Sequence, residues 1–316
     1  MADLNLAVAT HVLEELYPLR YAEEWDEPGL IVGDPAWPVR KIYCAVDPTR
    51  EVVQEAVDWG TDLLITHHPL FFRAVHNASG MGFRGDIVNT LIGHRCGLWV
   101  GHTNADSAHR GTAHAFADLL GLCDQRPLVP IDDPKALHPV GLGRVGRLPG
   151  PMTLRALAQC VADFLPKTEL GIQAAGDPNA LVSVVATLPG SGDSLFDEVR
   201  ASNADVYITS DLRHHPATDA WQQAKYEADL REHGYWLDDC ERDGTESAET
   251  SHEADRGNAG CTPRPMLINT PHSAIERSLF HYLVQDVPAA IEARTGVKPE
   301  IKLSQTNTDP WTLSLR

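Results

Sequence analysis

Short apolar runs alternate with helical stripes through the first third of the chain. Residues 41–46 and 63–66 are predicted to be buried strands, because both are short, apolar and bounded by turn residues. The segment between them repeats its apolar positions at helical spacing, and Thr49 and Gly60 are suited to its two ends. A strand, a helix and a second strand in this order predict a parallel pair joined by a right-handed crossover.

Two adjacent histidines stand where the second of these strands ends. His67, His68 and Pro69 follow it at once, and proline cannot extend the hydrogen-bond ladder of a strand. In open α/β sheets ligands bind at the carboxyl ends of strands, and neutral imidazole is the commonest protein metal ligand. Because adjacent side chains leaving a strand diverge, the pair fits two metals, or one metal and a substrate, better than one chelated ion. Two surface histidines in a loop are the alternative.

Another apolar strand breaks into polar residues in the same way. Residues 97–101 run into a segment that contains His102 and Asp106. The carboxylate of Asp106 offers hard oxygen atoms suited to divalent ions, or it could cap the helix predicted over residues 113–120. His102 follows the same strand end and is a candidate for proton transfer.

The strand pattern recurs in the second half of the chain. Residues 205–209 precede His214, His215 and Pro216 much as residues 62–66 precede the first histidine pair. This match indicates two halves built on one plan, or a chance likeness between short segments. We expect His214 and His215 to lie on the substrate side, since one metal site needs only a few imidazoles.

A further strand end carries a histidine and a glutamate. Residues 266–270 are predicted to form a strand, and Pro271 is suited to the first turn of a helix. His272 and Glu276 are four positions apart, so they share one helix face and can converge on one ion. A solvent-facing helical pair is the alternative.

Charge and cysteine usage narrow the classes of function. The formal net charge of -18 argues against electrostatic binding of nucleic acid, although bound divalent cations could reverse the local field for an anionic small molecule. The six cysteines form no Cys-x-x-Cys pair, and no signal peptide or long apolar span is visible. We therefore expect a reduced, cytoplasmic protein without a membrane partner.

Changes in composition divide the chain into predicted units. Residues 127–151 are rich in proline and glycine, which marks a boundary near Leu137. Residues 238–263 lose nearly all large apolar side chains, so we predict a flexible acidic insertion that cannot offset its ordering entropy. The predicted units are residues 1–136 with 264–316 as a metal-binding α/β module and residues 137–237 as a second α/β module.

Taken together, these motifs resemble the Nif-three-like family, also called GTP cyclohydrolase I type 2 homologues or dinuclear-metal-centre hexameric proteins. The resemblance rests on residues 65–69, residues 101–106, and His272 with Glu276. It implies two linked α/β modules, each a mixed sheet flanked by helices, that assemble into a ring-shaped homohexamer. It also implies two bound divalent metal ions, for which the ligands would be His67, His68, Asp106, His272 and Glu276. Two features depart from the family pattern: the late position of His272, behind the acidic insertion, and His214 where Tyr is common.

The ligand types suggest a chemistry. Three imidazoles and two carboxylates suit Zn, Fe, Mn, Co or Ni and are too few to saturate two ions, so water or hydroxide would fill the open positions. The hypothesis is a metal-dependent hydrolase of a small nucleotide-like or phosphorylated substrate, with His102, His214 and His215 as candidate catalytic groups. The family name implies opening of the GTP purine ring, which nothing in the spacing of these residues specifies. The alternative is a non-catalytic hexameric ring that acts as a scaffold, metal store or sensor.

Overall fold

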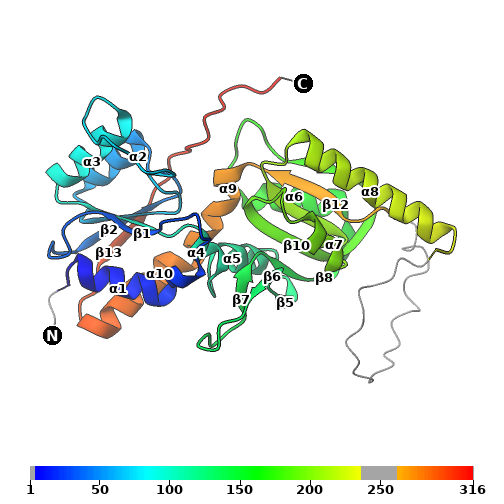
Figure 1. Ribbon diagram of the computed structural model, residues 1–316, viewed down its shortest axis with the longest axis horizontal. Helices are drawn as coiled ribbons and strands as arrows, with labels where there is room; N and C mark the ends of the chain where they lie inside the picture. Colours follow the sequence, from blue (N-terminus) through cyan, green and yellow to red (C-terminus); the bar gives the residue numbers. More distant parts are fainter. Residues whose placement is uncertain (1–3, 236–261, 316) are drawn as a thin grey trace.

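The computed structural model describes residues 4–235 and 262–315. Its described strands form two large sheets and one two-stranded hairpin. The two sheets build two halves that lie side by side along the long axis of the molecule (Figure 1). The prediction of two linked α/β modules, each a mixed sheet flanked by helices, is confirmed.

The first sheet has the strand order β1-β4-β3-β2-β13. Its strands are parallel except for β1, which runs antiparallel to β4. Ile42 lies opposite Leu63, so the parallel pair predicted from the first apolar runs is confirmed. The bounds are Gly29–Val32 for β1, Lys41–Ala45 for β2, Leu63–Thr66 for β3, Gly97–Val100 for β4 and Glu300–Leu303 for β13.

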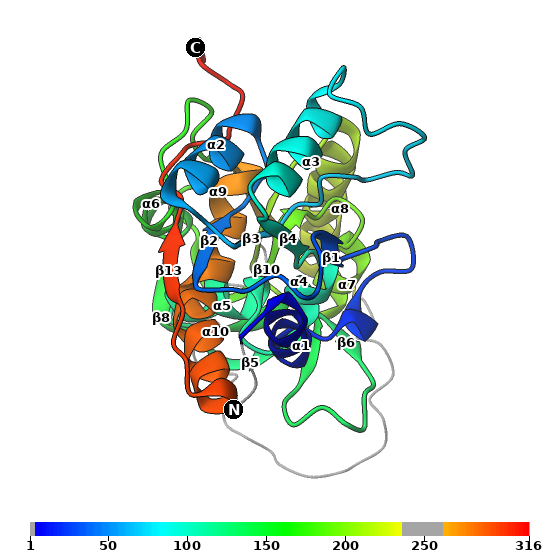
Figure 2. The ribbon, with the colours of Figure 1, turned by 90° about the vertical axis from the view of Figure 1, so that its left-hand side faces the viewer.

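Helices cover both faces of the first sheet (Figure 2). Side chains alternate across a strand, so Leu63 and Ile65 of β3 pack with the helices of one face, while Leu64 packs with those of the other. The first face carries α1 (Leu6–Leu16) and α10 (Phe280–Thr295), and the second carries α2 (Arg50–Trp59) and α3 (Phe83–Gly93).

Both ends of α2 lie at the residues that the sequence predicts, Thr49 and Gly60. The Thr49 side chain accepts a hydrogen bond from the backbone N–H of Val52, which satisfies one of the free donors of the first turn. Gly60 ends the helix with a φ of 78°, a conformation that glycine adopts without a Cβ penalty.

The second sheet has the strand order β5-β8-β10-β11-β12-β9, with β10, β11 and β12 parallel to one another. Along β11, Val206 and Ile208 pack against one layer of helices and Tyr207 against the other. The strands are β5 Cys123–Arg126, β8 Arg144–Thr153, β9 Gln173–Ala175, β10 Leu181–Ser191, β11 Val206–Ser210 and β12 Met266–Thr270, and the helices are α5 Thr112–Leu119, α6 Leu154–Phe164, α7 Phe196–Ala201, α8 His214–Glu232 and α9 His272–Glu276. The remaining elements are α4 Thr103–Ser107, the hairpin of β6 Val129–Ile131 and β7 Val140–Leu142, and the 3-10 turns η1 Leu19–Tyr21 and η4 Arg277–Leu279.

The two halves share one local hydrogen-bond pattern, which supports the internal repeat. Asp62 precedes β3 and accepts hydrogen bonds from the backbone of Arg40 and Lys41 beside the neighbouring β2. Asp205 precedes β11 and accepts equivalent bonds from Ser183 and Val184 in the neighbouring β10. In both halves an aspartate therefore ties the start of a parallel strand to its neighbour.

The sheets divide the chain differently from the predicted unit boundaries at two places. Strand β12 pairs with β11 along its length, from Met266 opposite Val206 to Thr270 opposite Ser210, so it belongs to the second sheet. Strand β5 also joins that sheet, through β8. The chain therefore leaves β12 in the second half and passes through α9 into α10, which covers the first sheet (Figure 1).

Gly143 separates β7 from β8, because its φ of 62° breaks the extended backbone between them. The predicted acidic insertion lies outside the described residues except for its last two positions. Among the described helices, none is both long and apolar enough to cross a membrane.

Candidate metal centre

The ends of two adjacent strands and one helix form the site. After β3, the His67 and His68 backbone N–H groups donate to the Val46 carbonyl beyond the end of β2, and the Thr66 hydroxyl donates to the His68 carbonyl. These bonds fix the turn in which the two histidines leave the sheet. After β4 the chain turns at once into α4, which carries Asp106.

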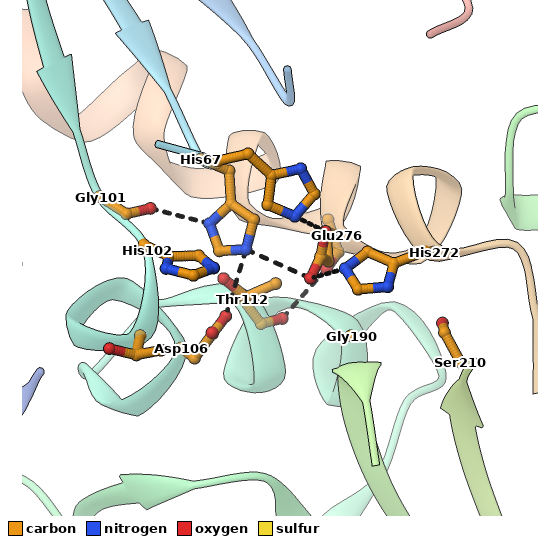
Figure 3. Close-up of polar contacts among 12 residues, drawn as sticks. His67, Gly101, His102, Asp106, Thr112, Gly190, Ser210, His272 and Glu276 are labelled. Atoms are coloured by element: carbon orange, nitrogen blue, oxygen red, sulfur yellow. Dashed lines mark hydrogen bonds and ion pairs between the residues drawn. The ribbon is translucent and has the colours of Figure 1, made fainter. Parts of the chain in front are cut away.

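The structure brings the five predicted metal ligands together around the Glu276 carboxylate (Figure 3). Its Oε1 lies 3.4 Å from His67 Nε2 and 2.9 Å from His272 Nε2. Its Oε2 lies 2.8 Å from His68 Nε2. Asp106 Oδ1 lies 3.6 Å from His67 Nε2. These residues, which are up to 209 positions apart in the sequence (276 minus 67), thus form one cluster.

Each of the three histidines has its other ring nitrogen held by an oxygen atom. An acceptor at Nδ1 keeps the proton of the neutral ring there, so the lone pair of Nε2 faces the cluster. This arrangement is typical of metal-binding histidines. The three pairs are His67 with the Gly101 carbonyl at 2.8 Å, His68 with Asp47 at 2.7 Å and His272 with Asp211 at 2.7 Å.

The donor atoms of the cluster fit a cation. His67 Nε2 and Asp106 Oδ1 are buried and have no hydrogen-bond partner among the described residues. A buried polar atom without a partner costs about 1–3 kcal/mol, and a divalent cation between these atoms would satisfy both. His67, His68 and Glu276 can each present one ligand atom within 4.8 Å of the others.

The electrostatics of the cluster favour positive charge beside Glu276. Burial raises the pKa of the Glu276 carboxyl, but His68 and His67 lower it more, so it stays well below its usual range. Burial lowers the pKa of His272, but the contacts with Asp211 and Glu276 outweigh this effect and raise it to about 10. Burial also lowers the pKa of His68, but Glu276 and Asp47 raise it more, so this pKa lies well above its usual value. A buried, ionised carboxylate with this much affinity for positive charge suits metal binding.

His102 lies beside the cluster. Its ring centroid is 5.4 Å from that of His67, and its Nδ1 is 3.0 Å from Asp26 Oδ2. The same oxygen accepts a hydrogen bond from the Thr103 hydroxyl at 2.6 Å. Burial raises the pKa of Asp26, but the bonds from His102 and Thr103 lower it more, and the net direction is down. Asp26 therefore remains an acceptor that fixes the orientation of the His102 ring.

The second histidine pair has a different surrounding. His214 and His215 are exposed in the first turn of α8, where their rings contact each other at 5.3 Å. No hydrogen bond or ion pair among the described residues joins them to the cluster, so their catalytic role stays a prediction. Asp211 is the residue that the same connection brings to the site.

Sequence reasoning missed Asp47, Asp211 and Gly190. Asp211 directly follows the end of β11 and Asp47 lies two residues after the end of β2, so the rule that found the histidines could have found both. Gly190 lies in β10 with a φ of 96°, and a Cβ built there would be 2.7 Å from Glu276 Oε1. The sequence carries no signal for that contact.

Replacing Asp47 or Asp211 by Asn tests the role of the carboxylates behind the histidines. We expect the affinity for Zn²⁺ to fall about 10- to 100-fold, the range found for outer partners of metal ligands. Competition with a chelating dye measures the affinity. The matched control is Asp62→Asn, which changes a carboxylate that binds only backbone at the start of β2. Equal affinities in all four proteins would contradict the prediction.

Comparisons with known proteins identify relatives of this chain. A family model described as Duf34/NIF3 (NGG1p interacting factor 3) matches residues 4–230. A Streptomyces coelicolor protein named GTP cyclohydrolase 1 type 2 homolog is 48% identical over 217 residues, which cover 68% of this chain and 75% of that protein. A Mycobacterium bovis protein of the same name is 30% identical over 318 residues and covers 68% of this chain and 83% of its own length.

Solved structures resemble the whole fold. A Bacillus cereus protein related to NIF3 has a TM-score of 0.77 at 20% identity, and the match covers 99% of this chain and 100% of that one. A Staphylococcus aureus hypothetical protein has a TM-score of 0.75 at 23% identity over the same shares. At these identities the likeness concerns the fold alone.

Proposed function

This chain belongs to the Duf34/NIF3 family, and on that premise we propose that it is a dinuclear divalent-metal protein that hydrolyses a small nucleotide-like or phosphorylated substrate. The observation that carries the proposal is the Glu276 carboxylate with three imidazole Nε2 atoms within 3.4 Å of it. His67 Nε2 and Asp106 Oδ1, which are buried and have no hydrogen-bond partner among the described residues, support it further.

His67, His68, Asp106, His272 and Glu276 would hold the two ions between them. Glu276 is central to this set, because its Oε1 contacts His67 and His272 and its Oε2 contacts His68. Nitrogen and oxygen donors without a thiolate fit Zn, Fe, Mn, Co or Ni. The number of ions and the predicted homohexamer stay predictions.

The residues around the cluster have separate roles in the proposed hydrolysis. When bound, two divalent cations supply Lewis acidity toward a substrate oxygen and lower the pKa of a nearby water molecule. Asp47 and Asp211 hold two of the imidazoles in the ligand tautomer. We assign proton transfer to His102, whose Nδ1 contacts Asp26 and whose ring lies beside that of His67. A cavity of about 720 Å³, whose wall includes His68 and His272, is large enough for a small substrate.

Metal content and turnover, measured together, test the proposal. Metal ions are counted by elemental analysis, and turnover is followed with GTP, nucleoside monophosphates and 4-nitrophenyl phosphate. We expect metal-dependent turnover of at least one of these compounds by the wild type. Asp106→Ala should lose one ion per chain and at least about 100-fold in rate, since loss of even an outer partner costs up to that much. Asp58→Ala, an exposed change on α2, is the control.

A wild-type protein that holds two ions per chain and turns over none of these compounds would contradict the hydrolase. It would favour the non-catalytic alternative, in which the protein is a scaffold, metal store or sensor.

A further inference from the structure

The cavity beside the cluster has a wall drawn from both halves of the molecule. His68 and His272 belong to this wall, together with residues from the starts of α2 and α3 and from the chain after β13. That final segment runs past α9, between the two halves (Figure 1). A molecule in this cavity would therefore contact two of the proposed metal ligands and residues of both halves.

Three exposed aromatic side chains gather around this one cavity. Phe72 is 55% exposed, Phe83 is 54% exposed and Trp311 is 58% exposed, and all three line it. Large apolar groups scattered singly over a surface need no explanation, but a group of them around an opening marks a binding site. Aromatic faces stack on planar rings, and such stacking contributes about 1–3 kcal/mol per nucleic-acid base.

Arg84 supplies a cationic group to the same wall. Its Nε donates to the Leu70 carbonyl at 2.8 Å, and its guanidinium lies 4.4 Å from the centroid of the Phe83 ring. These contacts fix the plane of the guanidinium, and no acceptor among the described residues holds its two terminal nitrogens. A fixed guanidinium fork matches phosphate and carboxylate groups. In a chain of net charge -18, such a cation beside a candidate metal centre is selective for an anion.

The carboxylates of the wall bind other partners, and no ion pair among the described residues joins any of them to Arg84. Asp47 and Asp211 hold His68 and His272. Asp309 accepts a hydrogen bond from the backbone N–H of Trp311. The pKa of Glu51 is lowered by its backbone hydrogen bond and by Thr49 in the first turn of α2. The other cation, Arg50, is already paired with Asp86 at 2.9 Å.

We propose that this cavity is the substrate subsite and that it selects a planar aromatic ring that carries a phosphate group. Trp311 and Phe83 stack on the ring, and Arg84 holds the phosphate. This inference rests on the proposed function, because the metal centre defines which wall the reacting group faces. It adds Arg84 and Trp311 as the residues that determine specificity.

Equilibrium binding to the Zn²⁺-loaded full chain, measured by calorimetry, tests the subsite. The probes are GMP, which has a ring and a phosphate, guanosine, which lacks the phosphate, and inorganic phosphate, which lacks the ring. We expect the wild type to bind GMP more tightly than either part. Arg84→Ala should weaken GMP binding at least about 10-fold and leave guanosine binding within about 2-fold. Trp311→Ala should weaken both GMP and guanosine about 10-fold.

Two control variants and a second titration make the outcome decisive. Arg155→Ala removes an exposed arginine from α6, and Tyr226→Ala removes an exposed aromatic ring from α8; neither residue lines the cavity. Both should bind GMP as the wild type does. If GMP does not bind, or binds Arg84→Ala and Trp311→Ala as tightly as wild type, the inference is overturned. Metal counts and turnover decide the proposed function separately, because Arg84-dependent binding needs no reaction, and a titration of metal-stripped protein should retain it.

Discussion

Glu276→Gln is expected to abolish binding of both metal ions. The carboxylate is buried and contacts His67, His68 and His272 through its two oxygens. The amide keeps the shape but removes the charge, and its NH₂ group would donate to a histidine Nε2 and occupy that ligand atom. We expect Zn²⁺ affinity to fall by more than about 100-fold, beyond the loss typical of an outer partner.

Metal-dependent stability gives an independent readout of the same change. Zn²⁺ at about 100 times its Kd stabilises a folded protein by about 2.7 kcal/mol, so a chelator should lower the Tm of the wild type. The Tm of Glu276→Gln should not respond to the chelator. The control is Glu55→Gln, which removes a carboxylate bound to Tyr43 and Ser304 away from the cluster. A Glu276→Gln protein that retains wild-type metal content would remove the basis of the proposed centre.

Gly190→Ala is expected to displace the Glu276 carboxylate, although it substitutes no ligand residue. The backbone at Gly190 has a φ of 96°, and the added Cβ would lie 2.7 Å from Glu276 Oε1. The side chain of Glu276 must therefore move away from the histidines, or the strand must shift. We expect metal affinity to fall about 10- to 100-fold, as when a ligand loses its support, and stability to fall by about 1–3 kcal/mol from backbone strain.

A substitution at Gly60 distinguishes the effect of backbone strain from the effect of displacing Glu276. Gly60 also has a positive φ, 78°, but a Cβ there would meet no atom within 4 Å. Gly60→Ala should therefore lose stability in urea denaturation and keep its metal affinity. If both variants bind Zn²⁺ as the wild type does, Gly190 has no part in positioning Glu276.

Much of the candidate site follows from a local rule about strand ends. His67 and His68 come directly after a buried strand whose apolar run and turn residues are evident in the sequence, and Asp106 lies six residues after the end of the next such strand. The four-residue spacing of His272 and Glu276 likewise indicates one helix face, as α9 has it. These features depend on residues that are close together in the sequence, so periodicity and spacing are enough to predict them.

The second histidine pair shows where the local rule stops. Four residues more than in the first copy separate the Ile-Thr step of the pattern from His214 and His215. That extra length carries them onto α8, while Asp211, nearer the strand end, reaches His272. The repeat in the sequence thus indicates the similar strands correctly, but not which side chain of the second half meets the first.

Local patterns in the sequence predict the main strands and helices and five polar residues suited to metal, because each of these depends on neighbouring residues. Packing between distant segments places β12 in the second sheet and leads α9 from there to the first, which carries Glu276 to His67 and His68. It also decided that Asp47 and Asp211 stand behind the histidines and that Gly190 leaves room for the carboxylate. These contacts join segments more than 20 residues apart, or different sheets, and arise from packing that no local pattern records.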